Sequence, residues 1–398
     1  MYEFRPFELT QCQYKKYGKS SIGRGINCIP KARSGHRCVA NESDLFSFGG
    51  YNPDIDTKLL PELLKFNFLT KKWSIVFSSN SEEMPKESVS NALTLKDNCL
   101  VLYGGTGFPF GEKRSNETYL IWPYGFRKIE KLPTRGDRPE ELYGQSILVR
   151  GHYLYVLGGT SGHDFTCDIH RLNLNTRTWE LLYQSNENIR DDPKGRYRQE
   201  IAYDDDYIYI FGGGTQDTSF DMDRIPVYNF HQNRFTFIPT KPDLAIKENG
   251  GYPEARRFHS CVQQPGDNGI EVIIAGGSKQ DGLYFDDIWK FNLSTHQWQL
   301  LTKSKLPYVL YFHDAAAVGN GLMYIFGGVT TNTRDVVRKN DLHKIWTQIP
   351  KLTEICWEAV TFYHPNIVDQ SKEQLLSVGI PRKFADRITH GRNSGAIF

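Results

Sequence analysis

Long apolar runs, an excess of charge of one sign and paired cysteines are all missing from this sequence. No window approaches the ~18 consecutive apolar residues that a membrane helix needs, and the first residues lack the basic start and apolar core of a secretory signal. Lysine and arginine total 48 against 46 acidic residues, a formal charge of +2. We therefore expect neither membrane insertion nor charge-driven binding to nucleic acid, and any anion site must be local.

The cysteines are few and scattered. There are seven among 398 residues, an odd number, and no Cys-x-x-Cys pair occurs. This spacing supports neither a disulfide framework nor a structural zinc site, and it fits a reducing compartment. We therefore expect a protein of the cytoplasm and nucleus that needs no metal or other cofactor.

Glycine, in contrast, is abundant and periodic. Six Gly-Gly doublets recur at intervals of 51 to 64 residues. The doublets are Gly49–Gly50, Gly104–Gly105, Gly158–Gly159, Gly212–Gly213, Gly276–Gly277 and Gly327–Gly328. Each follows a run of β-forming residues such as Tyr207–Phe211, which predicts an inner strand whose end approaches another backbone too closely for a Cβ. Such a period is typical of a stacked or circular array.

Each unit carries further strand signals around its doublet. A strand opened by proline lies upstream, and an apolar residue, a turn and an aromatic residue follow downstream, most clearly in Leu172–Trp179 and Phe291–Trp298. Four strands in each of six units predict an all-β fold, a six-bladed β-propeller, because each small sheet buries its faces only against its neighbours. We assign residues 30–350 to the propeller, 1–29 to an N-terminal extension and 351–398 to a helical tail. Residues 2–10 are a candidate for a strand that closes the ring.

The loop before the first strand of each unit, here called the lead-in loop, is expected to face the central mouth of the propeller. Arginine recurs at one slot of these loops, twice with a second arginine nearby; the five are Arg33, Arg196, Arg198, Arg256 and Arg257. A ring of guanidinium groups could hold one carboxylate by bidentate hydrogen bonds. Further polar candidates are His36, Tyr143, Gln145, His259 and Ser260. The alternative, strongest for Arg33 and His36, is that these side chains brace adjacent loops by bonding to carbonyl groups.

Aromatic residues after the first two doublets form a second candidate feature. They are Tyr51 and the pair Phe108 and Phe110. We expect them either to wall the central cavity or to staple the loops that carry them.

After Pro350 the apolar spacing becomes helical. One apolar stripe, with a spacing of four, is formed by Leu352, Cys356 and Val360. A second helix is expected from the capping-box spacing of Ser371 and Gln374. A third segment, with proline suited to a first helical turn, contains Ile380, Pro381, Phe384 and Ile388. The stripe needs a partner surface, which is either another protein or the side of the propeller.

These features together resemble a known family. A pattern that occurs six times over about residues 30–350 resembles the kelch repeat: an apolar strand, a Gly-Gly doublet and then a spaced aromatic residue. In the tail, the stripe resembles an elongin-binding box, in which Lys351 departs from the usual small residue, and the third segment resembles a Cullin-2 box. The combination is similar to the kelch domain-containing protein ten family and its insect relatives. The phrases most specific to that likeness are Ala32–Cys38, Gly104–Gly111, Gly195–Arg198, Ala255–Arg257 and His259–Cys261.

The resemblance implies a non-catalytic substrate receptor of a Cullin-2 RING ubiquitin ligase. The propeller would capture client proteins by a C-terminal glycine or alanine tail, whose carboxylate would be held by Arg196, Arg198, Arg256 and Arg257. The helical tail would bind Elongin-C, with Elongin-B, and Cullin-2, with its RING subunit. The resemblance also implies activation of an apoptosis-signal-regulating kinase cascade through restraint of protein phosphatase 2A.

Two other classes of function stay open. A kelch scaffold without ligase activity would bind signalling or cytoskeletal proteins and would not capture elongin. An oxidase built on a kelch ring would need secretion and a copper site, and the sequence shows no coherent Tyr, His and Cys constellation for one.

Overall fold

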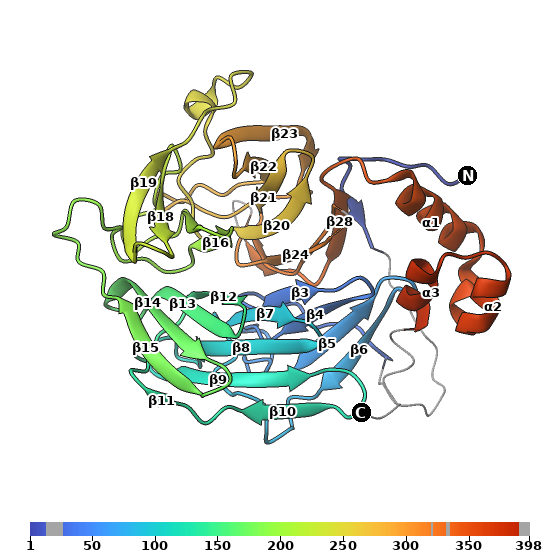
Figure 1. Ribbon diagram of the computed structural model, residues 1–398, viewed down its shortest axis with the longest axis horizontal. Coiled ribbons are helices and arrows are strands. Elements are labelled where there is room, and N and C mark those ends of the chain that lie inside the picture. Colours follow the sequence, from blue (N-terminus) through green and yellow to red (C-terminus); the bar gives the residue numbers. More distant parts are fainter. Residues whose placement is uncertain (13–26, 320, 332–334, 390–398) are drawn as a thin grey trace.

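Six small, mainly antiparallel sheets stand around a common axis as the blades of a β-propeller (Figure 1). The computed structural model describes residues 1–12, 27–319, 321–331 and 335–389. The blades follow one another in chain order, and a short helical tail lies outside the ring (Figure 1). The predicted all-β, six-bladed propeller with a C-terminal helical region is therefore confirmed.

Each blade contains four successive strands, with one departure in blade six. Blades one to three comprise β3 (Arg37–Ala40), β4 (Asp44–Phe48), β5 (Leu63–Asn67), β6 (Lys72–Phe77); β7 (Ala92–Lys96), β8 (Cys99–Thr106), β9 (Arg114–Trp122), β10 (Lys128–Lys131); and β12 (Ser146–Arg150), β13 (Tyr153–Thr160), β14 (Phe165–Asn173), β15 (Thr178–Tyr183). Blades four to six comprise β16 (Glu200–Tyr203), β17 (Tyr207–Phe211), β18 (Arg224–Asn229), β19 (Arg234–Pro239); β20 (Ser260–Gly266), β21 (Gly269–Ala275), β22 (Asp287–Asn292), β23 (Gln297–Lys305); and β24 (Asp314–Val318), β25 (Leu322–Phe326), β28 (Leu342–Trp346).

Short strands extend three of these sheets. β1 (Thr10–Gln11) pairs with β28, where Thr10 lies opposite Lys344, so blade six takes its fourth strand from the N-terminal segment. β2 (Asn27–Cys28) pairs with β6, and β11 (Arg135–Gly136) runs parallel to β15. A hairpin of β26 (Val329–Thr331) and β27 (Val336–Arg338) branches off between β25 and β28, and a 3-10 turn, η1 (Glu248–Gly251), precedes β20.

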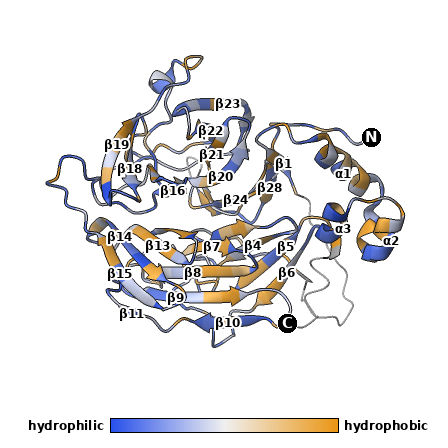
Figure 2. Cartoon of the chain, viewed as in Figure 1, coloured by the Kyte–Doolittle hydropathy of each residue, from blue (hydrophilic) through white to orange (hydrophobic). Residues whose placement is uncertain are grey.

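The hydrophobic cores lie between neighbouring blades. Trp298 of blade five packs against Phe211 of blade four, with ring centroids 5.9 Å apart, and Trp179 of blade three packs against Tyr103 of blade two at 5.6 Å. Both tryptophans are the spaced aromatic residues of the repeat pattern. Figure 2 shows hydrophobic residues along strands such as β6 and β8. Each blade therefore buries its faces against its neighbours, as a repeat architecture requires.

The doublets mark the points where lead-in loops cross the ends of strands. The strands that end in a doublet lie inside each sheet, second from the axis. The preceding strands β3, β7, β12, β16, β20 and β24 line the axial cavity. The expected close approach is present. A Cβ on Gly105 would lie 2.3 Å from the carbonyl oxygen of Glu87, and a Cβ on Gly212 would lie 2.3 Å from that of Arg256. No side chain fits at such positions.

The tail folds as three helices beside blades one and six (Figure 1). They are α1 (Leu352–Tyr363), α2 (Lys372–Ser377) and α3 (Arg382–Thr389), with a 3-10 turn, η2 (Pro365–Asp369), between the first two. Ser371 and Gln374 form the expected capping box of α2. A small core unites the helices and contains Trp357, Leu375, Phe384 and Ile388. No helix in the described ranges is long and apolar enough to span a membrane.

Candidate functional site

Six lead-in loops meet around the axis at residues with a left-handed backbone. These residues, one from each blade, have φ between 52° and 72° and are Gly35, Ser90, Gly144, Arg198, Phe258 and Phe312. Their backbones are joined from blade to blade: the Gly35 N–H donates to the Phe312 carbonyl at 2.9 Å, and the Gly144 N–H donates to the Ser90 carbonyl at 2.7 Å. The loops therefore form a ring of main chain at the end of the propeller where the innermost strands begin.

The side chains of this ring differ in size between the two halves of the propeller. Blades one to three supply glycine or serine, whereas blades four to six supply Arg198, Phe258 and Phe312. The two phenylalanine rings stack at 3.8 Å, and the Arg198 guanidinium lies 5.3 Å from the Phe312 ring. Arg198 Nη2 donates to Ser90 Oγ at 2.7 Å and to the Gly35 carbonyl at 3.4 Å, so it crosses from blade four to blades two and one. We call these three large side chains the axial plug.

On one side of the plug lies a cavity of about 270 Å³, here called the mouth. Its walls are largely aromatic and include Tyr51, Phe110, Tyr143, Tyr197, Tyr311 and Phe312. Tyr51 also stacks on Phe108 at 5.3 Å, so the aromatic loops both wall the cavity and staple one another. An apolar wall with a few hydroxyl groups is the usual composition of a ligand pocket.

One charged side chain lines the mouth within the described residues, and the sequence reasoning missed it. Arg338 of β27 donates from Nε to Ser34 Oγ at 3.1 Å, and its guanidinium lies 4.9 Å from the Tyr51 ring. Burial lowers its pKa. The only sequence signal was the irregularity of blade six, where an inserted hairpin brings this arginine to the axis.

Three of the arginines expected to face the mouth brace the blades instead. Arg33, Arg196 and Arg256 each donate through Nη1 to the carbonyl of the first glycine of a doublet, at 2.9, 3.0 and 3.0 Å. Arg256 also binds both oxygens of Asp287, at 2.5 and 2.8 Å, and Arg33 pairs with Glu62 at 2.7 Å. All three arginines are buried, and none lines the mouth. We therefore correct the expectation that they converge on a ligand, because their donors fasten the lead-in loops to the doublets.

Two other candidates lie near the mouth. Arg198 lies beneath it, hydrogen-bonded to the lining residue Ser90, and burial with the neighbouring charge of Arg37 lowers the Arg198 pKa to about 10. Arg257 donates to the Thr215 carbonyl and to Gln280, and it lies 4.9 Å from the Phe258 ring. Tyr143 lines the mouth itself.

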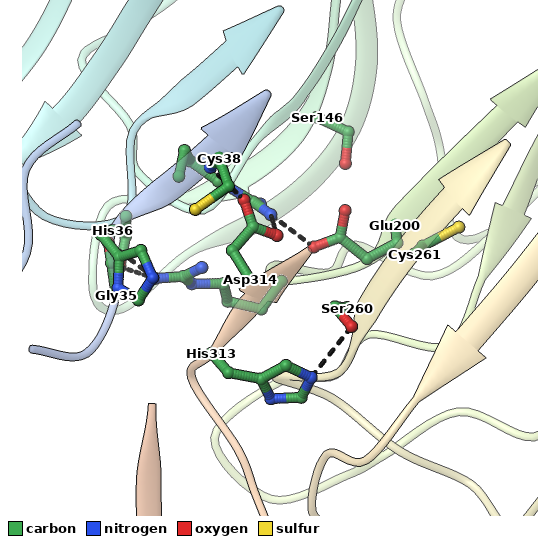
Figure 3. Close-up of polar contacts among 12 residues, drawn as sticks. Gly35, His36, Cys38, Ser146, Glu200, Ser260, Cys261, His313 and Asp314 are labelled. Atoms are coloured by element: carbon green, nitrogen blue, oxygen red, sulfur yellow. Dashed lines mark hydrogen bonds and ion pairs between the residues drawn. The ribbon is translucent and has the colours of Figure 1, made fainter. Parts of the chain in front are cut away.

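The remaining candidates lie inside the propeller. His36, Gln145 and His259 are buried in the position after the ring residue, each against a doublet of its own blade. His36 Nε2 bonds to the Phe326 carbonyl at 3.1 Å. Ser260 Oγ bonds to His313 Nε2 at 2.9 Å (Figure 3). None of these groups lines the mouth, and Gln145 lines the cavity on the other side of the plug, so we correct their expected contact with a ligand in the mouth.

On the other side of the plug lies a second cavity, of about 340 Å³, here called the channel. Arg37 Nη1 bonds to Glu200 Oε1 at 2.7 Å and lies 3.5 Å from Asp314 Oδ1, so three blades each place a charge there. The Cys38 N–H donates to Asp314 Oδ2 at 2.6 Å. Figure 3 shows Glu200 and Asp314 approaching each other from different strands. Burial raises the pKa of both carboxyl groups, and Arg37 opposes that rise.

The apolar stripe of α1 faces away from the propeller. Leu352 is 73% exposed, Cys356 is exposed and Val360 is partly buried. Glu354 and Glu358 lie on the opposite face of the helix, which is anchored to the rest of the protein. The sequence left open whether the stripe docks on the propeller, and the structure leaves most of it uncovered.

Ion pairs anchor the inner face of α1. Glu354 is buried and bonds to Lys383 at 2.6 Å and to Arg387, which also contacts Glu42 of the loop between β3 and β4. Glu358 accepts hydrogen bonds from Lys344 at 2.6 Å, Trp346 at 3.2 Å and the hydroxyl of Tyr2 at 2.9 Å. The direction of the exposed stripe is therefore fixed relative to blades one and six.

The third tail segment is less exposed than a continuous binding surface requires. Phe384 and Ile388 are buried, and the Phe384 ring stacks on Trp357 at 4.8 Å. Pro381 is exposed and Ile380 is partly buried. We correct the expectation that all four residues offer a cullin surface, because two of them form the core of the tail.

The fold and the site define a kelch-repeat β-propeller with an aromatic mouth on its axis. A family described as the KLHDC2/KLHL20/DRC7 Kelch-repeats domain matches residues 21–213 and 202–366. The chain is 42% identical to the Kelch domain-containing protein 10 homolog of Drosophila melanogaster, over 98% of this chain and 66% of that protein, so it spans just under two thirds of that relative. It is 41% identical to Kelch domain-containing protein 10 of Xenopus laevis, over 90% of this chain and 86% of that protein. It is 40% identical to Kelch domain-containing protein 10 of Homo sapiens, over 90% of this chain and 80% of that protein. The chain belongs to the Kelch domain-containing protein 10 family.

Proposed function

We propose that this protein is the substrate-recognition subunit of a Cullin-2–Elongin-B/C RING ubiquitin ligase. Its mouth binds the free C-terminus of client proteins that end in glycine or in an alanine tail, and the ligase then ubiquitinates them for degradation. The protein performs no bond chemistry itself. The observation that carries the proposal is the exposed stripe of Leu352 and Cys356 on a helix whose opposite face is anchored.

The tail supports recruitment of a partner. An uncovered apolar stripe on a helix is the kind of surface that docks into a groove of another protein. Because Glu354 and Glu358 hold α1 against the propeller, a protein bound to the stripe would keep a constant position relative to the mouth. That is what a receptor needs in order to present a client. With Phe384 and Ile388 buried, we limit the proposed Cullin-2 contact to Ile380 and Pro381.

The mouth supports binding of a carboxylate at the end of a peptide. Arg338 on its wall and Arg198 beneath its floor supply positive charge, and Ser34, Ser90 and Tyr143 supply hydroxyl groups. Charge-assisted hydrogen bonds in a partly desolvated pocket are the strong ones. A small last residue lets the carboxylate approach the plug, while aromatic walls hold the preceding residues.

The alternative is a kelch scaffold that binds signalling or cytoskeletal proteins without elongin. Co-purification with Elongin-B and Elongin-C separates the two. The wild-type chain should capture both, and Leu352→Ser with Cys356→Ser should abolish capture. Val378→Ser is the matched control, because Val378 is another exposed apolar residue of the tail, 70% exposed, outside the stripe. A wild-type chain that captures no elongin contradicts the ligase proposal.

The mouth is tested separately with short peptides that end in glycine, alanine or amidated glycine. Fluorescence polarisation should show tighter binding of the two free acids than of the amide. Equal binding of acid and amide contradicts carboxylate recognition. Location in the cytoplasm and nucleus belongs to the proposal; regulation of protein phosphatase 2A and of a kinase cascade stays a prediction from the resemblance.

A further inference from the structure

The channel contains two carboxylates that the proposed function does not use. Glu200 and Asp314 are the first residues of β16 and β24, and their side chains are only 12% and 7% exposed. Both face Arg37, whose Nε is fixed separately by the Asn91 carbonyl at 3.1 Å. Burying two carboxylates next to one guanidinium would be costly unless a further positive charge lies near.

Arg198 supplies that charge from within the plug itself. Its electrostatic partners are Arg37, which repels it, and Glu200 and Asp314, which attract it. Arg198 is only 2% exposed, and its Nε has no hydrogen-bond partner in the described part of the chain. Two guanidinium groups and two carboxylates therefore form one buried axial cluster whose formal charge is zero.

This cluster lies directly beneath the mouth. Arg198 is bonded to Ser90 and Gly35, and both of these residues line the mouth, while Glu200 and Asp314 line the channel on the other side. A carboxylate that binds against Arg198 from the mouth therefore also experiences the negative charges of Glu200 and Asp314. Because the cluster is buried, salt screens this repulsion only weakly.

We infer that Glu200 and Asp314 are specificity-determining residues for the mouth, which restrict its floor to ligands that carry a single negative charge. They cancel the charge of the two arginines, so the arginines hold one carboxylate by hydrogen bonds but do not attract anions in general. A terminus with a second acid group, such as a last residue of aspartate, must desolvate a second charge with no net positive charge from the cluster to offset that cost, so it is disfavoured. This inference rests on the proposed capture of C-terminal peptides in the mouth.

The test compares two peptides of equal shape that end in Asn and in Asp with a free carboxylate. Wild-type protein should bind the Asn peptide more tightly. Glu200→Gln should bind the Asn peptide roughly tenfold more tightly and the Asp peptide roughly a hundredfold more tightly, as expected when a unit charge about 10 Å away is removed at an effective dielectric constant of about 20. The same peptide with an amidated terminus and a neutral last residue should be unaffected.

Two further variants keep the test decisive. Glu271→Gln is the matched control, because Glu271 is another buried carboxylate that pairs with a single lysine, Lys290, at 3.0 Å, outside the channel lining. Asp314→Asn replaces Glu200→Gln if thermal denaturation shows that the latter is unfolded, since an amide oxygen can still accept the Cys38 N–H.

The outcomes separate the two claims. If wild-type protein binds free and amidated peptides equally, the proposed function fails. If it prefers the free acid but the ratio of Asn to Asp affinity is the same in Glu200→Gln, Asp314→Asn and wild type, the specificity role is overturned. A similar change of that ratio in Glu271→Gln also overturns it.

Discussion

Arg198 Nη2 donates a 2.7 Å hydrogen bond to Ser90 Oγ, which joins two blades that are not neighbours in the ring. The bond is possible because blades one to three place glycine or serine at the ring position, which leaves space on the axis for a long side chain from blade four. The propeller is therefore closed on its axis by side chains from one half, and a guanidinium lies directly beneath the floor of the mouth.

Arg198→Gln should weaken binding of a peptide with a free terminal carboxylate. Loss of a buried charge-assisted contact costs about 2–5 kcal/mol, which corresponds to at least a thirtyfold weaker affinity. Arg257→Gln should have a small effect, since that guanidinium is bonded to surface loops. Titration calorimetry with a glycine-ending peptide measures both, and an Arg198→Gln protein with unchanged affinity contradicts the assignment.

Arg256→Met should destabilise the fold. The change removes the guanidinium partner of the Asp287 carboxylate, which keeps only its hydrogen bond from Trp289 Nε1 at 2.7 Å among the bonds to side chains. Breaking such a buried ion pair costs about 3–5 kcal/mol of stability. Urea unfolding gives the free energy of unfolding. The double variant Arg256→Met with Asp287→Asn should recover part of the loss, because no uncompensated charge is left. Equal stability of Arg256→Met and wild type would show that the brace is unimportant.

The two glycines of one doublet should respond differently to substitution. Gly105→Ala places a Cβ 2.3 Å from the Glu87 carbonyl oxygen at φ +112°, whereas the nearest atom to a Cβ on Gly104 is the movable Gln145 amide, at 3.1 Å and φ +65°. We expect Gly104→Ala to cost about 1–2 kcal/mol, the usual cost of a left-handed alanine. Gly105→Ala should cost clearly more, because a main-chain atom must move. Thermal denaturation of both variants checks the order, and the reverse order would contradict the packing argument.

Stability should fall in mild acid partly because of buried histidines. Burial lowers the pKa of His313 from 6.5 to about 3. Between pH 6.5 and about pH 3, this histidine binds a proton in the unfolded chain but not in the folded chain. Its contribution to stability is therefore complete above pH 6.5 and is lost as the pH falls through this range. At about pH 5 the loss from this residue is about 2 kcal/mol.

His313→Gln should reduce that loss, and blades three and four already carry glutamine at the same position, Gln145 and Gln199. Urea unfolding at about pH 7.5 and about pH 5 gives the difference for each chain. His163→Gln, at an exposed loop position, is the control and should behave as wild type. The same loss in all three chains would rule out His313 as its source.

Glu358→Ala should free α1 from blade six without unfolding the propeller. The change removes the acceptor of Lys344, Trp346 and Tyr2. Hydrogen exchange in residues 352–363 should become at least several-fold faster, while the melting temperature changes little. Glu373→Ala, on the exposed first turn of α2, is the control. Unchanged exchange in α1 would show that the remaining contacts of the tail are enough to hold it.

The repeat was predictable from the sequence because its signals are local. The doublets report close backbone approaches, and the spaced residues Trp179 and Trp298 report the cores between blades. In each unit the doublet and the spaced aromatic residue lie within a few tens of residues of each other. The capping box of Ser371 was equally local. The site was less predictable, because an arginine that bonds to a carbonyl has the same sequence signal as one that faces a ligand. Arg33, Arg196 and Arg256 were misplaced for this reason, and Arg338 was missed because it lies in an insertion outside the repeat.

The sequence by itself determined that this chain forms a ring of six blades with a helical tail that carries an apolar stripe. Glycine spacing, aromatic spacing and helical periodicity each act over a few neighbouring residues, so they can be read along one chain. Only the tertiary structure decided which charges reach the axis and which are used as braces. That choice depends on the sizes of side chains at six ring positions spread over nearly 280 residues, which meet only when the ring closes.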